Sequence, residues 1–160
     1  MLRRRLLPLL ALAAAALLTG CATQQKSEDL AGHFVVDPSD PYGELKKFKG
    51  SVNLLTARLT VSFQHLFSIG ELYKEGPRGD EIMKGALSNI KRIHAELAKY
   101  PPQAARVRAT IPADNAKLLA AYDAYVTALK GVASIDYGDI SQERIDALVQ
   151  AGSDMEPLIP

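Results

Sequence analysis

The chain has little net charge and a single cysteine. Its formal net charge at pH 7 is +1 over 160 residues, and its one thiol belongs to Cys21. A near-neutral chain lacks the positive field that binds nucleic acid. A lone cysteine forms no disulfide within its own chain, so the fold must depend on a hydrophobic core. We therefore expect no nucleic-acid partner and a core built from apolar side chains.

Motifs of common enzymes and metal sites are also missing. The chain contains neither the Gly-x-Ser-x-Gly of hydrolases nor the Gly-x-x-x-x-Gly-Lys-[Ser/Thr] of phosphate-binding loops. Helical bundles often bind metal through Glu-x-x-His. No glutamate stands three positions before any of the histidines, which are His33, His65 and His94. We expect a protein that is not an enzyme and uses no cofactor and no metal.

The N-terminal apolar run is too short to cross a membrane. Arg3 to Arg5 precede 13 residues, Leu6 to Leu18, that are apolar apart from Pro8, whereas a membrane-spanning helix needs about 20. A basic start, a short apolar run and small residues after it are typical of a secretory signal peptide. This pattern predicts export and removal of residues 1–20.

The end of this segment, Leu18-Thr19-Gly20-Cys21, resembles the lipobox of bacterial lipoproteins. The resemblance implies cleavage before Cys21 and acyl chains on that residue, which anchor the protein to a membrane. Two or three chains on one residue hold far more firmly than one. Ala22 follows, where an aspartate would favour the inner membrane, so the resemblance favours the periplasmic face of the outer membrane.

The expected organisation has three parts: residues 1–20 are the signal peptide, 21–40 the lipidated cysteine with a flexible tether, and 41–158 a helical domain. A tether of this length spans about 25 Å on average. Three of the 19 basic residues and none of the 18 acidic residues lie in residues 1–20. The chain that remains after cleavage has 16 basic residues and a net charge of −2.

The first expected helix is long. Asp40 is suited to cap its N-terminus and Pro41 to its first position, while Gly76 and Pro77 end it. Apolar residues recur at alternating spacings of three and four, as in a heptad seam with one polar member. The seam consists of Leu45, Phe48, Val52, Leu55, Leu59, Ser62, Leu66, Ile69 and Tyr73.

Three further helices are expected. The second runs from Asp80 until Pro101 and Pro102, with an apolar stripe of Met83, Leu87, Ile90, His94 and Leu97. We interpret His94 as a hydrogen-bonded core residue. Residues 103–111 fit a loop, a short helix or an edge strand. The third follows Pro112, and its apolar residues are Leu118, Leu119, Tyr122, Tyr125, Val126, Leu129 and Val132.

The fourth helix is expected to begin after Ser141 as N-cap, with Ile145, Leu148 and Val149 inward and Gly152 near its end. Four helices with short connections predict an all-α, antiparallel bundle.

The first helix carries a second apolar stripe. At 100° per residue, Leu54, Val61 and Leu72 share the side away from the seam, and His65 flanks them. Two interpretations remain open. The helix is central and has neighbours on both sides, or the second stripe is exposed and receives a partner helix or a second copy of the chain.

These observations predict a non-enzymatic adaptor or accessory subunit of the bacterial envelope, which contacts an envelope protein or itself through Leu54, Val61, His65 and Leu72. The alternative is a small apolar ligand bound between the helices. A cavity lined by Tyr122, Tyr125 or His94 would favour that alternative.

Overall fold

The described part of the chain is an antiparallel bundle of α-helices. The computed structural model describes residue 37, residues 39–72 and residues 77–160, and these contain no β-strand. All of them belong to one compact unit, residues 31–160. Cys21, the predicted signal peptide and nearly all of the predicted tether lie outside the described residues.

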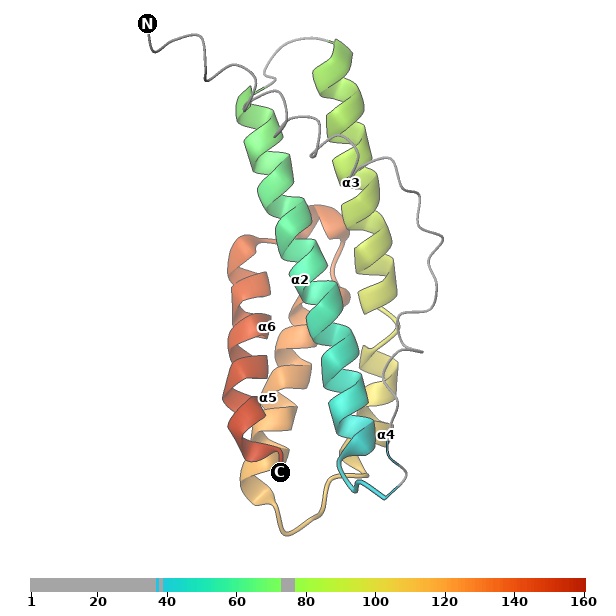
Figure 1. Ribbon diagram of the computed structural model, residues 1–160, viewed down its shortest axis with the longest axis vertical. Coiled ribbons are helices and arrows are strands. Elements are labelled where there is room, and N and C mark those ends of the chain that lie inside the picture. Colours follow the sequence, from blue (N-terminus) through green and yellow to red (C-terminus); the bar gives the residue numbers. More distant parts are fainter. Residues whose placement is uncertain (1–36, 38, 73–76) are drawn as a thin grey trace, which may run out of the picture. The chain divides into compact units, whose positions relative to one another are not determined.

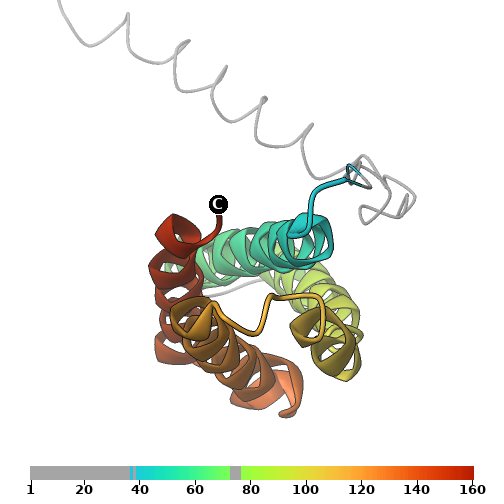
Figure 2. The ribbon, with the colours of Figure 1, turned by 90° about the horizontal axis from the view of Figure 1, so that it is seen from below.

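Four long helices form the bundle. They are α2 (Gly43–Leu72), α3 (Pro77–Leu97), α5 (Ala116–Ala133) and α6 (Gln142–Met155). The short helices are η2 (Pro101–Gln103), α4 (Ala104–Arg108), η3 (Tyr137–Asp139) and η4 (Glu156–Leu158). Viewed from below in Figure 2, α2, α3 with α4, α5 and α6 surround a common centre. The predicted all-α antiparallel bundle is confirmed.

The heptad seam of α2 forms one wall of the core. Every seam residue from Leu45 to Leu59 is buried, and so is the polar member, Ser62. Its hydroxyl accepts a hydrogen bond from Asn89 Nδ2 of α3 at 2.9 Å. A buried hydroxyl costs little when it is paired, which explains how a serine is tolerated in the seam.

The start of α2 differs from the sequence prediction. Asp40 was expected to cap a helix beginning at Pro41, but α2 begins at Gly43. Asp40 Oδ1 accepts a hydrogen bond from the Tyr42 amide at 2.8 Å, and its other oxygen lies 2.9 Å from Lys46 Nζ. The carboxylate thus closes a local turn, as aspartates often do, and the helix starts two residues later.

The other helices confirm most of the predicted pattern. Pro77 begins α3 three residues earlier than expected, in a position that suits proline. Residues 104–108 form the short helix α4, which resolves the ambiguity of that segment. Ser141 caps α6 as predicted, because its hydroxyl accepts from the Arg144 amide at 3.3 Å.

Val149 corrects the prediction for α6, because it was expected inward but is 49% exposed. Gly152 lies in the last turn of α6, near its end as predicted, and is buried. A Cβ at Gly152 would lie 3.2 Å from Tyr125 Cε2 and 3.3 Å from Asn53 Oδ1. Gly152 is therefore a point of close packing of α6 against α2 and α5.

We expect Gly152→Val to lower the free energy of unfolding by about 1–3 kcal/mol, because the added atoms crowd a packed site. Gly85→Ala is the matched control in α3, where no atom lies within 4 Å of the new Cβ. It should raise stability by up to about 1 kcal/mol through helix propensity. Urea unfolding measures both changes, and equal effects of the two substitutions would contradict the packing argument.

Candidate partner-binding surface

The four main helices differ in length. Because a helix rises 1.5 Å per residue, the 30 residues of α2 span about 45 Å, whereas the 18 of α5 and the 14 of α6 span about 27 Å and 21 Å. Figure 1 shows α2 and α3 continuing past the connection between α5 and α6. The upper ends of α2 and α3 therefore lack the helices that cover them lower down.

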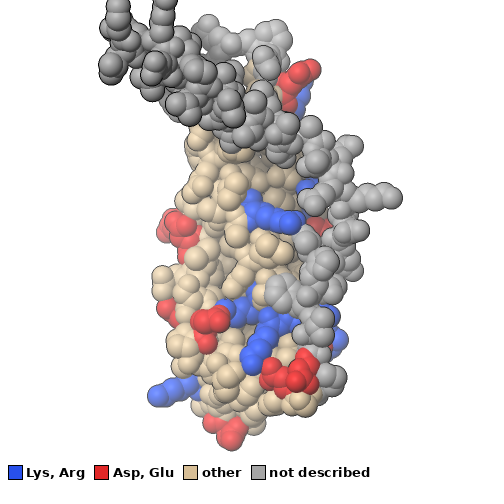
Figure 3. Space-filling model, in the orientation of Figure 1, with Lys and Arg blue, Asp and Glu red and all other residues tan. Residues whose placement is uncertain are grey.

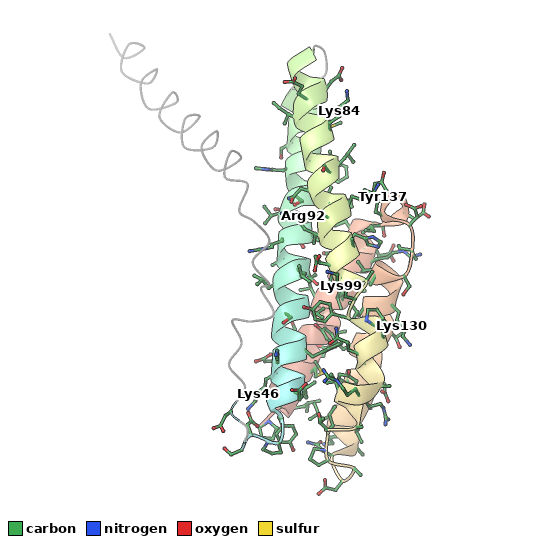
Figure 4. All side chains as sticks on the ribbon, turned by 90° about the vertical axis from the view of Figure 1, so that its right-hand side faces the viewer. Lys46, Lys84, Arg92, Lys99, Lys130 and Tyr137 are labelled. Atoms are coloured by element: carbon green, nitrogen blue, oxygen red, sulfur yellow. The ribbon has the colours of Figure 1, made fainter. Side chains whose placement is uncertain are left out.

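Two contacts mark where this cover ends on α3. His94 Nε2 donates to the carbonyl of Val132, near the end of α5, at 3.1 Å. Lys91 Nζ lies 5.7 Å from the centre of the Tyr137 ring in η3. Figure 4 shows Tyr137 and Arg92 at a similar height, with Lys84 well above both. We name residues 62–72 of α2 and 77–89 of α3 the hairpin extension.

One side of the hairpin extension continues the core-facing side of the bundle. Phe63 is half-buried against the core, and Phe67, one turn later on the same side of α2, is 67% exposed. Leu87 lies one turn before Lys91 and two turns before His94, so it shares the side of α3 that meets α5 and η3 below. It is 42% exposed, although its stripe was predicted to be core.

Met83, one turn before Leu87, is half-buried. We name the four residues Phe63, Phe67, Met83 and Leu87 the inner face of the hairpin extension. Phe67 is not among the surface residues predicted from the sequence, because it falls outside both stripes of α2. The available signal was the length of the first helix, which is too long for the later helices to cover.

The predicted partner surface lies on the opposite side of α2. Val61 is 57% exposed and His65 is exposed, so neither belongs to the core. Leu54 is half-buried. Leu72 ends α2, and its side chain lies outside the described part of the structure. We name Leu54, Val61 and His65 the outer stripe.

The charged residues in the middle of α2 have one sign. Between Glu44 and Glu71, every Lys, Arg, Asp or Glu residue of α2 is basic: Lys46, Lys47, Lys49 and Arg58. Arg58 is exposed and lies one turn after Leu54. On the face shown in Figure 3, most charged side chains lie over the lower half, and the part of α2 above them is mostly uncharged. The outer stripe is thus an apolar strip beside basic groups.

A groove of about 620 Å³ separates α2 from α6 and η4. Its lining residues are Lys49, Asn53, Thr56, Ala57, Val149, Gly152, Ser153, Glu156 and Pro157. Lys49 is buried and forms an ion pair with Glu156. Burial lowers the pKa of the Lys49 ammonium group. The buried charge in the groove, the ammonium group of Lys49, is therefore already paired with the carboxylate of Glu156.

The residues predicted for a ligand cavity are engaged within the protein. The Tyr122 hydroxyl donates to the Ala104 carbonyl and the Tyr125 hydroxyl to Asn53 Oδ1, both at 2.9 Å. Both tyrosines are fully buried, and burial raises the pKa of each hydroxyl. His94 is hydrogen-bonded to the carbonyl of Val132 as predicted, but it is half-buried and lies at the edge of the core.

Comparisons with protein-family models, curated proteins and solved structures find no match for the chain. Among the described residues, no helix is both long enough and apolar enough to span a membrane.

Proposed function

We propose that this protein is a lipid-anchored, non-enzymatic adaptor of the bacterial envelope, attached through acyl chains on Cys21 and contacting an envelope protein through the outer stripe. The observation that carries the proposal is the 57% exposure of Val61 on a helix whose seam is buried from Leu45 to Ser62. Leu54, two turns before Val61, is half-buried, so the two side chains form an apolar strip, and apolar strips on a helix face are typical of protein–protein contacts.

The chemistry of the outer stripe indicates the kind of partner. Apolar atoms of Leu54 and Val61 suit the apolar side of an amphipathic helix. The guanidinium of Arg58, and the lack of acidic residues in α2 between Glu44 and Glu71, favour acidic groups along the edges of that helix. We therefore infer an amphipathic helix flanked by Asp and Glu as the segment that binds.

The expected localisation of the protein supports a partner in the envelope. The signal peptide and the lipobox resemblance place the folded domain beside a membrane, most simply at the periplasmic face of the outer membrane. A tether of about 25 Å keeps the domain close to that surface. Binding of a small apolar ligand has less support, because Tyr122, Tyr125 and His94 make hydrogen bonds within the protein.

Site-specific photo-crosslinking in cells tests the proposal. We expect a photoreactive amino acid in place of Val61 to capture one envelope protein, whereas the same group in place of Ala120, an exposed residue of α5, captures none. Cys21→Ser should remove the crosslink, because the unlipidated chain no longer lies at the membrane. The captured peptide should map to an acidic amphipathic helix.

Two outcomes would contradict this proposal. Equal capture from the positions of Val61 and Ala120 would show that the outer stripe is not selective. Capture that persists undiminished in the Cys21→Ser chain would show that anchoring is not part of the function.

A further inference from the structure

The inner face of the hairpin extension lacks a covering element among the described residues. Lower in the bundle, the same sides of α2 and α3 are covered by α5 and α6. Above that level Phe67 and Leu87 are 67% and 42% exposed. An amphipathic helix pair normally buries its apolar side, and a pair of three-turn helices gains little stability on its own. The inner face therefore has the properties of half an interface.

We propose that a second copy of this chain covers the inner face, so that two hairpin extensions pack about a two-fold axis and complete a four-helix bundle. The proposal rests on Phe67 and Leu87, not on the outer stripe. It goes beyond the adaptor function, because it assigns a dimer as the working unit.

The shape of the uncovered surface favours a second copy. In the lower half, the element that covers α2 and α3 is an antiparallel pair of helices, α5 and α6 (Figure 2). The hairpin extension is itself an antiparallel pair with one apolar side. In a two-fold arrangement both subunits contribute the same patch. The two hairpin extensions therefore have the same length by symmetry. A single foreign helix would leave part of the surface bare.

Electrostatic repulsion does not oppose this contact between two copies. The four residues of the inner face are Phe63, Phe67, Met83 and Leu87, and all are uncharged. Two identical patches repel each other when they carry net charge of one sign. The charged residues of the hairpin extension have both signs, since Glu71, Asp80 and Glu81 are acidic and Arg78 and Lys84 are basic. The inner face can therefore pack against the same face of a second chain without charge repulsion. The basic surface near Arg58 could not.

The size of the contact indicates where dimers form. The hairpin extension includes 11 residues of α2 with a length of about 16 Å, so two such extensions bury less than the roughly 800 Å² per partner of a standard interface. Confinement of both copies to one membrane surface raises their effective concentration. We expect dimers on the membrane and only weak association of chains that lack the anchor.

Cysteine crosslinking of the full chain in cells tests this arrangement, because Cys21 is the only native cysteine. Membranes containing Phe67→Cys or Leu87→Cys are treated with a short bis-maleimide and resolved by denaturing electrophoresis. We expect a product of twice the chain mass from both variants, about tenfold more than from the controls. The controls are the unsubstituted chain and Val61→Cys, which is equally accessible on the outer stripe.

A second measurement separates a specific contact from chance collision. In the Leu87→Cys chain, Phe67→Asp should lower the dimer yield about tenfold, whereas Val61→Asp should leave it unchanged. Equal dimer yield from Val61→Cys and Phe67→Cys would overturn the proposal. So would a Phe67→Cys chain that stays monomeric or crosslinks only to another protein. None of these outcomes bears on capture from the position of Val61.

Discussion

Above pH 10 the protein is expected to lose stability steeply, because two buried tyrosines resist deprotonation. Tyr122 and Tyr125 are fully buried, and burial raises the pKa of both hydroxyls above their usual range. The unfolded chain releases these protons near pH 10, whereas the folded chain retains them. The free energy of unfolding then falls by about 1.4 kcal/mol per pH unit for each tyrosine.

The size of this effect is large relative to the stability of a domain. At pH 11.5 the two tyrosines together account for about 4 kcal/mol, against a total stability of about 5–15 kcal/mol for typical domains. Below pH 10 both states keep the protons, so the tyrosines add no pH dependence there. Urea unfolding from pH 8 to pH 11.5, with tyrosinate absorbance, measures the loss.

Phenylalanine variants isolate the tyrosines from other groups. At neutral pH, Tyr125→Phe should cost about 1 kcal/mol, because it removes the hydrogen bond to Asn53. At high pH it should halve the slope, so the variant becomes more stable than the native chain. Tyr137→Phe, at an exposed ring, is the control and should leave the slope unchanged. An unaltered slope in the Tyr122→Phe, Tyr125→Phe double variant would refute the assignment.

Lys49 changes the free energy of unfolding with pH in the opposite direction to the tyrosines, so the two effects can be separated. Burial lowers the pKa of Lys49, so the folded chain releases this proton at lower pH than the unfolded chain does. Its contribution to stability therefore rises with pH until the unfolded lysine also titrates near pH 10.4. A gain before the tyrosine-dependent loss would identify Lys49, and Lys49→Met should remove it.

Periodicity in the sequence is sufficient to predict which side of α2 is buried over most of its length. The seam of α2 is correct from Leu45 to Ser62, because alternating spacings of three and four place these residues on one side of a helix. The same pattern predicts four helices, and short connections make them antiparallel. This part of the fold follows from local rules that need no knowledge of neighbouring helices.

The errors arise where a neighbouring element decides the outcome. Leu87 continues a correct stripe, but it is exposed because α5 ends before reaching it. Val149 was predicted to face inward, but it is 49% exposed on α6. Asp40 is a residue type that is common at N-caps, but it closes the turn to Tyr42 before the helix starts. Periodicity contains no information on the lengths or distances of partner helices.

The candidate surface was predictable only in part for the same reason. The outer stripe, with Val61 and His65, follows from periodicity within one helix. To predict the inner face, one needs to know the positions of α2 and α3 and the point at which α5 ends. A comparison of expected helix lengths points to uncovered residues, but it does not identify Phe67 and Leu87 among them.

A single substitution at two neighbouring positions of α2 should give opposite results. Leu59→Asp should unfold the protein, because Leu59 is fully buried in the middle of the seam and an unpaired carboxylate there costs more than about 4 kcal/mol. Val61→Asp should change the free energy of unfolding by less than about 0.5 kcal/mol, because Val61 faces water. Circular dichroism and urea unfolding of both chains measure the difference.

The pair of substitutions also tests the basis of the proposed function. Both replace an aliphatic side chain by the same carboxylate, two residues apart in one helix, so differences in helix propensity between them are small. A chain that unfolds on Val61→Asp would mean that another segment covers the outer stripe, and the stripe could not then receive a partner. A folded Val61→Asp chain that no longer binds the envelope protein would separate binding from folding, because its seam, including Leu59, remains intact.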